Sequence, residues 1–94
     1  MTNRKYFMKV LIADPISKHG LSILSDSGLD LIIKADSSLD EKLRAVEEVD
    51  GIIIRSGTKV DNKMLRIAKS LKVIGRAGVG IDNIELAAAT RRGI

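Results

Sequence analysis

The chain has 94 residues, enough for one small domain with a thin hydrophobic core. Apolar residues make up 45% of it and charged residues 30%, as in ordinary globular proteins, and no apolar run is long enough to span a bilayer. The absence of cysteine excludes a disulfide framework and a thiolate metal site, and the cytoplasm is the expected compartment.

The formal net charge of +4 raises the question of nucleic-acid binding. Lys and Arg are scattered among Asp and Glu, one Tyr and one Phe are the only aromatic residues, and no segment carries a basic stripe. This distribution argues against a nucleic-acid partner. We attribute the surplus of positive charge to a solvated surface and to a few arginines placed for a small anion.

The chain opens with a polar, basic stretch that leads into the first predicted strand. Residues 1–8 lack the apolar region and cleavage site of a signal peptide, so we expect a short extension ahead of the domain. Residues 9–13 form a nearly continuous apolar run, the pattern of a strand buried on both faces. Asp14 and Pro15 end this strand.

Two helices and a second strand are predicted next. Apolar residues recur at helical spacing over 16–24, and Gly28 marks the end of that helix. Residues 29–33 alternate in part and predict a strand. Ser38 and Glu41 have the spacing of a capping box at the start of a second helix. The residues expected on its inward face are Leu39, Leu43 and Val46.

The second half of the chain continues the alternation. Residues 51–54 (GIII) predict a third strand, which the polar sequence RSGTK follows. Asp61 or Asn62 is expected to cap a third helix. Its inward residues are expected to be Met64, Leu65, Ala68 and Leu71. Residues 72–74 then predict a fourth strand that opens into a glycine-rich loop.

The last predicted helix covers residues 84–92. Asn83 is expected to cap it, and Arg91 and Arg92 stand in its last turn, where positive charge favours the helix dipole. Ile94 stands where a fifth strand is expected to begin, which would leave the fourth strand as an exposed edge.

This alternation of strands and helices predicts a parallel sheet with helices on both faces, joined by right-handed crossovers. We therefore expect a flavodoxin-like, three-layer α/β/α fold with four strands present and the fifth truncated. Residues 9–94 are expected to form part of one domain. In such sheets, ligands bind beyond the carboxyl ends of the strands.

Two polar clusters fall at that edge of the predicted sheet. The loop after the fourth strand carries Gly75, Gly78 and Gly80 beside Arg76. Unshielded backbone N–H groups beside a guanidinium suit a carboxylate or a phosphate, although a tight turn without a ligand would use the same glycines. Arg55 follows the third strand, and consecutive crossovers commonly place such strands side by side. We therefore expect Arg55 and Arg76 to be neighbours in one anion site.

Other chemistries fit the sequence poorly. A dinucleotide-binding GxGxxG loop starting at Gly78 would need glycine at position 83, which is Asn. The Gly-Lys-Ser/Thr of a phosphate-binding P-loop is absent. A phosphoryl-accepting receiver domain needs an Asp where Arg55 stands. His19 has no partner at ligand or catalytic spacing, so we interpret it as a surface or capping residue and expect no metal site.

Two sequences carry a resemblance to a known family. IIIRSGTKV (52–60) and VIGRAGVGIDNIELAAATRRGI (73–94) resemble the substrate-binding domain of the D-isomer-specific 2-hydroxyacid dehydrogenase family. The resemblance extends over essentially the whole chain from Lys9. The RSGTKV element together with Arg76 is similar to the phosphoglycerate branch of the family rather than the lactate or glycerate branches.

The resemblance implies an enzyme of two α/β domains, in which a separate Rossmann domain, absent from this chain, binds NAD. It implies oxidation of 3-phospho-D-glycerate to 3-phosphohydroxypyruvate, the first step of serine biosynthesis. The family's catalytic Arg, Glu and His match no position here, so this chain alone is expected to be inactive. A complete protein is expected to form a homo-oligomer and to bind neither nucleic acid nor membrane.

The resemblance also assigns substrate-binding roles within this chain. The substrate carboxylate is expected at backbone N–H groups of Gly78, Val79 and Gly80, and Val79 is expected to lie against the nicotinamide. Arg55 and Arg76 correspond to arginines that hold and orient the phosphorylated end. Further candidates beside them are Ser56, Thr58 and Lys59.

Two alternatives remain open at this stage. A sister enzyme of the family acting on glycerate, glyoxylate or lactate would share the fold and the glycine loop. A stand-alone anion-binding module without chemistry would also explain the paired arginines.

Overall fold

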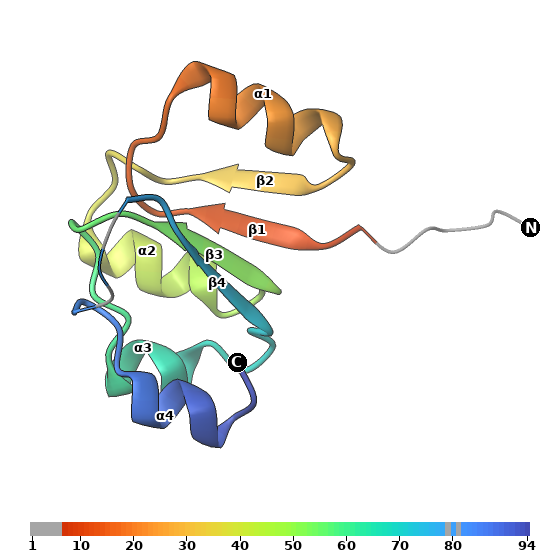
Figure 1. Cartoon of the computed structure of the whole chain (residues 1–94). Coiled ribbons are helices and arrows are strands. Elements are labelled where there is room, and N and C mark those ends of the chain that lie inside the picture. Colours follow the sequence, from red (N-terminus) through yellow and green to blue (C-terminus); the bar gives the residue numbers. More distant parts are fainter. Residues whose placement is uncertain (1–6, 79, 81) are drawn as a thin grey trace, which may run out of the picture.

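Four strand-helix units follow one another in the computed structural model, which describes residues 7–78, 80 and 82–94 (Figure 1). The elements are β1 (Lys9–Ile12), α1 (Lys18–Asp26), β2 (Asp30–Ile33), α2 (Leu39–Val46), β3 (Gly51–Ile54), α3 (Asn62–Ile67), β4 (Val73–Arg76) and α4 (Leu86–Arg91). None of the helices among these residues combines the length and the apolar character needed to cross a membrane.

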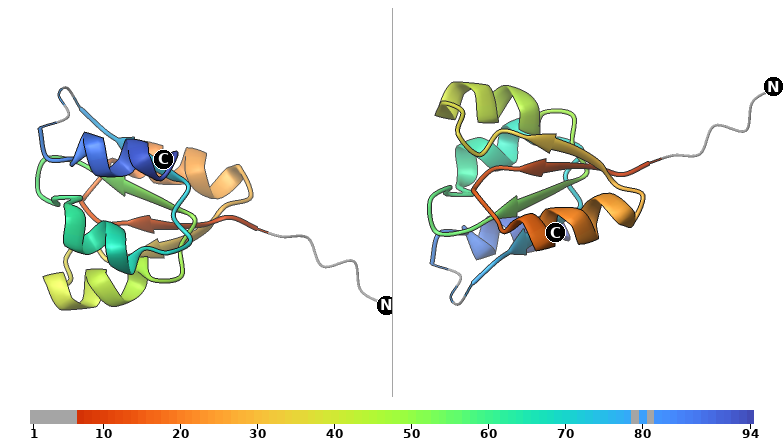
Figure 2. Two further views of the ribbon diagram at one scale, coloured as in Figure 1. Left: turned by 90° about the horizontal axis from the view of Figure 1, so that it is seen from below. Right: turned by 90° about the horizontal axis from the view of Figure 1, so that it is seen from above.

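The strands form one parallel sheet in the order β2-β1-β3-β4. The chain moves outward from β1 to β2 and then crosses back over β1 to β3. Because such crossovers are right-handed, α1 lies on one face of the sheet, and α2 and α3 lie on the other (Figures 1 and 2). Helix α4 lies beside α3. The expected α/β/α architecture with a parallel sheet is confirmed.

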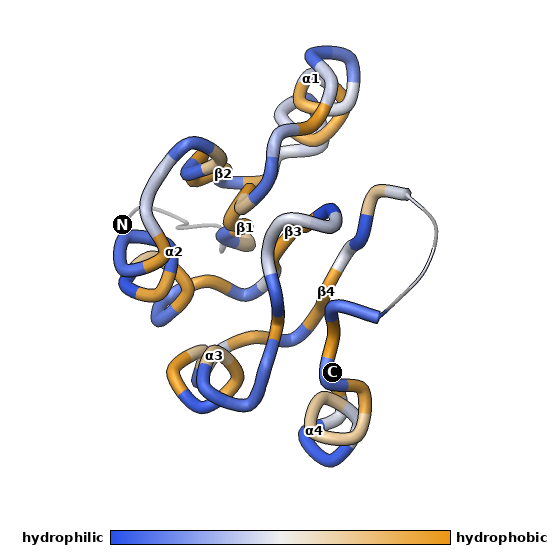
Figure 3. Tube along the Cα trace, turned by 90° about the vertical axis from the view of Figure 1, so that its left-hand side faces the viewer, coloured by the Kyte–Doolittle hydropathy of each residue, from blue (hydrophilic) through white to orange (hydrophobic). Residues whose placement is uncertain are grey.

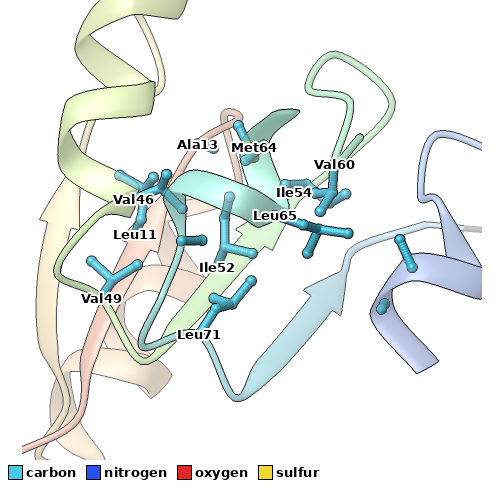
Figure 4. Close-up of a cluster of buried hydrophobic side chains, with 13 residues drawn as sticks. Leu11, Ala13, Val46, Val49, Ile52, Ile54, Val60, Met64, Leu65 and Leu71 are labelled. Atoms are coloured by element: carbon cyan, nitrogen blue, oxygen red, sulfur yellow. The ribbon is translucent and has the colours of Figure 1, made fainter. Parts of the chain in front are cut away.

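The hydrophobic core lies between the sheet and the helices α2, α3 and α4 (Figure 4). Alternate strand residues point to this side, including Leu11 of β1 and the pair Ile52 and Ile54 of β3. Helix α1 has no buried residue, although its apolar side faces the sheet (Figure 3). The inward residues expected for α3 are all buried: Met64, Leu65, Ala68 and Leu71. The core is therefore thick on one face and thin on the other.

Local capping signals place α2 and α3 where the sequence predicts them. The Ser38 hydroxyl accepts the N–H of Glu41, and the Glu41 carboxylate accepts the N–H of Ser38, so the predicted capping box is confirmed. Asp61, rather than Asn62, caps α3 by accepting the N–H of Met64. Leu39 was expected to face inward and is 61% exposed, because this first residue of α2 lies at the rim of a surface cavity.

The fourth strand is longer than the sequence predicts. Gly75 and Arg76 belong to β4, paired with Ile53 and Ile54 of β3, whereas the glycines predict a loop from residue 75 onward. Gly75 lies against the β3 side chain of Ile53, whose Cγ1 would be 3.6 Å from a Cβ at position 75, and its backbone is not in a conformation that requires glycine.

Asn83 does not cap the last helix, and this expectation is corrected. Helix α4 begins at Leu86, and its N-cap is Glu85, whose side chain makes no capping hydrogen bond. The backbone of residues 83–85 instead forms a parallel bridge with Val60. The N–H of Val60 donates to the Asn83 carbonyl, and the N–H of Glu85 donates to the Val60 carbonyl, both over 2.9 Å. The backbone pairing of residues 83–85 with Val60 therefore takes the place of the expected cap of α4 by Asn83.

Arg92 stabilises a different helix from the one expected. Its guanidinium donates to the carbonyls of Leu65, Ala68 and Lys69, at the carboxyl end of α3. Carbonyls at the end of a helix have few partners within it, so the arginine adds a charged donor there and holds α4 beside α3.

Most of the predicted extension, residues 1–6, lies outside the described residues. Phe7 is exposed, and the Met8 carbonyl accepts the N–H of Asp30 over 2.9 Å at the start of β2.

Candidate functional site

Two arginines meet at the carboxyl edge of the sheet. Arg76 is the last residue of β4 and pairs with Ile54, so it lies beside Arg55, which directly follows β3. The expectation that the two arginines are neighbours is confirmed. Both line a cavity of about 560 Å³ between α1 and the two strands. Ile23 and Ile53 belong to its apolar lining.

The two arginines differ in how firmly they are held. The side chain of Arg76 is only 10% exposed, and its Nε donates to Asn83 Oδ1 over 2.8 Å. Its Nη2 also lies 4.0 Å from a carboxylate oxygen of Asp82, which is almost fully exposed. Arg55 is exposed, and its backbone rather than its side chain makes the hydrogen bonds described below. One guanidinium is therefore preorganised, and the other is able to adjust to a ligand.

Asp14 fixes the loop that carries Arg55. This buried carboxylate accepts the N–H of Arg55 over 2.7 Å, the N–H of Thr58 over 3.0 Å and the Thr58 hydroxyl over 2.7 Å. Burial raises the pKa of Asp14, but these hydrogen bonds and the charge of Lys42 outweigh it and hold the pKa below its ordinary value. Asp14 is therefore an ionised anchor between β1 and the loop after β3.

Asn83 joins the same loop to Arg76. Its side-chain N–H groups donate to the carbonyls of Arg55 and Thr58, each over 2.6 Å, while its Oδ1 accepts from Arg76. The amide side chain thus binds three groups: the carbonyls of Arg55 and Thr58 in the loop after β3, and the buried guanidinium of Arg76. The relative positions of the two arginines depend on it.

The glycine loop after β4 adopts backbone angles that require glycine. Gly78 and Gly80 have φ values of 122° and 94°, a region in which a side chain is strained. Gly78 lines the cavity with the two arginines. Val79 lies outside the described residues, and so do the carboxylate and nicotinamide contacts expected for it.

The structure separates the remaining predicted binding residues from this cavity. Thr58 is buried, and its hydroxyl is used by Asp14. Thr58 and Lys59 line a second cavity, between the loop, α2 and α3. Ser56 is exposed in the loop between the two cavities. Sequence reasoning missed Asp14 and the bracing role of Asn83, because both depend on partners far along the chain.

The glycine loop does not fit a dinucleotide. Where the third glycine of such a loop would allow close approach, Asn83 fills the space between two loops with a braced side chain. Helix α4 starts three positions later and has only six residues. Among the described residues, no group of three or more metal-binding side chains occurs.

An open parallel sheet with two arginines and a glycine loop at its carboxyl edge defines an α/β domain suited to a small anionic ligand. The family model for the catalytic domain of D-isomer specific 2-hydroxyacid dehydrogenases matches residues 10–94. The chain therefore belongs to that family.

Several known proteins are similar to the chain. A D-3-phosphoglycerate dehydrogenase of Archaeoglobus fulgidus is 48% identical over 87 residues, which are 93% of this chain and 16% of the relative. The crystal structure of the PH0520 protein from Pyrococcus horikoshii is 34% identical with a TM-score of 0.85, and covers 95% of this chain and 26% of its own.

A third similar protein is the NAD+-bound 3-phosphoglycerate dehydrogenase of Entamoeba histolytica. It is 25% identical with a TM-score of 0.80, and the match covers 95% of this chain and 32% of that one. The chain thus spans less than a third of the length of each of these relatives.

Proposed function

We propose that this chain is the substrate-binding part of an NAD-dependent phosphoglycerate dehydrogenase. The reaction is the oxidation of 3-phospho-D-glycerate to 3-phosphohydroxypyruvate, at the start of serine biosynthesis. The observation that carries the proposal is the pair Arg55 and Arg76 in one cavity, beside the exposed Gly78. A substrate with an anion at each end matches this pair of binding elements.

The residues of the chain bind and orient the substrate in this proposal. Arg76, held by Asn83, sets the position of one anionic group, and the exposed Arg55 closes on the ligand. Backbone N–H groups at positions 78–80 receive the carboxylate. NAD, held by a separate Rossmann domain, accepts the hydride when bound. The complete protein is proposed to be cytoplasmic and homo-oligomeric, and the 94 residues alone are proposed to be inactive.

Kinetics of the complete protein test this function. Arg55→Ala and Arg76→Ala are each expected to lower kcat/KM for 3-phosphoglycerate by about 30- to 1000-fold, because losing a charged hydrogen-bond partner costs about 2 to 4 kcal/mol. Arg91→Ala is the control, since this exposed arginine on α4 has the same charge and does not line the cavity. Unchanged kinetics in both site variants would contradict the proposal.

Substrate comparison separates this enzyme from its sister enzymes. Rates with 3-phosphoglycerate should exceed those with glycerate, glyoxylate or lactate, and the excess should disappear in Arg55→Ala. Equal rates in the unmodified protein would assign it to another branch of the family. Micromolar binding of phosphoglycerate by the 94-residue chain alone would favour a stand-alone binding module.

A further inference from the structure

A second cavity opens at the same edge of the sheet, on the side of α2 and α3. Its volume is about 320 Å³, and it shares no lining residue with the cavity of the two arginines. Three lysines line it: Lys42 from α2, Lys59 from the loop after β3 and Lys63 from α3. We call it the lysine cavity.

The lysine cavity carries a surplus of positive charge. The ion pairs observed among the described residues involve Lys72 and Arg76 and none of the three lysines. Of the described residues that line the cavity, Asp61 is the only acidic one, and its Oδ1 already accepts the N–H of Met64 as the cap of α3. Three lysines therefore line the cavity with one engaged carboxylate, and the buried Asp14 carboxylate, on which the charge of Lys42 acts, offsets only part of the surplus. Like charges around one concave surface repel each other, and a bound anion relieves that repulsion.

The walls of the lysine cavity also limit the shape of a ligand. Leu39 and Leu43 contribute apolar surface, and Leu39 is largely exposed. Gly57 and Thr58 form the side nearest the sheet, where the hydrogen bonds to Asp14 hold the backbone of Thr58 in place. A rigid wall with lysines around it suits a compact ligand with a short carbon skeleton or none.

We propose that the lysine cavity is a binding site for a small polyanion that carries phosphate groups or several carboxylates. Lys59 is central to it, because it lines this cavity together with Lys42 and Lys63 and does not line the cavity of Arg55. The proposal does not depend on the reaction assigned to the first cavity.

Chemical footprinting of the complete protein tests the site. The lysines are acetylated and quantified by mass spectrometry with and without pyrophosphate, and separately with citrate. At a ligand concentration of about ten times Kd, the acetylation rates of Lys42, Lys59 and Lys63 should fall about tenfold, because only unoccupied protein reacts. Lys69, exposed after α3 and outside the cavity, should react at an unchanged rate. Protection by pyrophosphate alone identifies phosphate chemistry, and protection by citrate alone identifies polycarboxylates.

Two variants that remove the same charge at different places test whether the protection arises in the lysine cavity. Lys59→Gln/Lys63→Gln should abolish the protection of Lys42. Lys69→Gln/Arg91→Gln, which removes the same charge elsewhere, should retain it. The proposal would be overturned if neither ligand protected the lysines. It would also be overturned if the two variants lost the protection of Lys42 equally. Neither measurement involves phosphoglycerate or NAD, so this outcome is independent of the test of the proposed function.

Discussion

Asn83 connects the two arginines of the candidate site through one side chain. Replacing it with Ala leaves the carbonyls of Arg55 and Thr58 without their donor and removes the acceptor that fixes Arg76. We expect Asn83→Ala to lower the free energy of unfolding by about 1 to 3 kcal/mol. Urea denaturation measures this. Asn62→Ala is the control, because Asn62 is exposed on α3 and should change stability by less than about 0.5 kcal/mol. Equal stability of both variants would show that Asn83 braces nothing.

Asp14 gives the loop a dependence on pH. Its pKa in the folded state is lowered, so its contribution to stability is complete above the unfolded pKa of about 4 and is lost as the pH falls through the folded pKa. Asp14→Asn should therefore lower stability by about 2 kcal/mol at neutral pH. The difference between variant and parent should shrink as the pH falls below about 4.

Urea unfolding at a series of pH values measures this difference. The control is Asp36→Asn, an exposed carboxylate after β2, which should leave stability nearly unchanged at neutral pH. A deficit of Asp14→Asn that persists undiminished in acid would mean that the carboxylate acts through shape rather than through charge.

At the scale of secondary-structure elements, Arg92 links α4 to the end of α3. Arg92→Ala should cost about 1 to 2 kcal/mol of stability, because the carbonyls of Leu65 and Ala68 lose a charged donor. Thermal unfolding measures the effect. Arg91→Ala is a close control: the neighbouring arginine is exposed in the same turn and makes no hydrogen bond among those observed. If both substitutions lower the midpoint equally, the loss of positive charge at the carboxyl end of α4, and not the contact with α3, is responsible.

Elements governed by local interactions could be predicted from the sequence. The bounds of β3, the capping box of α2 and the buried residues of α3 follow from patterns within a few residues. The pairing of Arg55 with Arg76 was also predictable, since it follows from the order of the crossovers. The sequence did not reveal the roles of Asp14, Asn83 and Arg92, because each has at least one hydrogen-bond partner 23 or more positions away.

At the scale of the whole molecule, the core is unequal on the two faces of the sheet. α1 and α2 are of similar length, yet α2 buries Val46 and abuts α3, whereas α1 has no buried residue. We expect the backbone amides of α1 in the 94-residue chain to exchange hydrogen faster than those of α2, because local opening of α1 exposes little apolar surface.

Hydrogen exchange followed by mass spectrometry compares the two helices within one sample, so each serves as the reference for the other. Slower exchange in α1 than in α2 would contradict the expectation and would indicate that α1 is held by more than its contacts with the sheet.

The contact between Asp14 and the Thr58 N–H joins residues 44 positions apart. It cannot form until β1 and β3 lie side by side, and β3 follows α1, β2 and α2 along the chain. Closing so long a loop has an entropic cost, which is offset only when the strands pair. This contact therefore forms late in folding. A growing chain that has emerged only as far as α2 carries the anchoring carboxylate and neither arginine. The ability to recognise an anion therefore arises only once most of the sheet is in place.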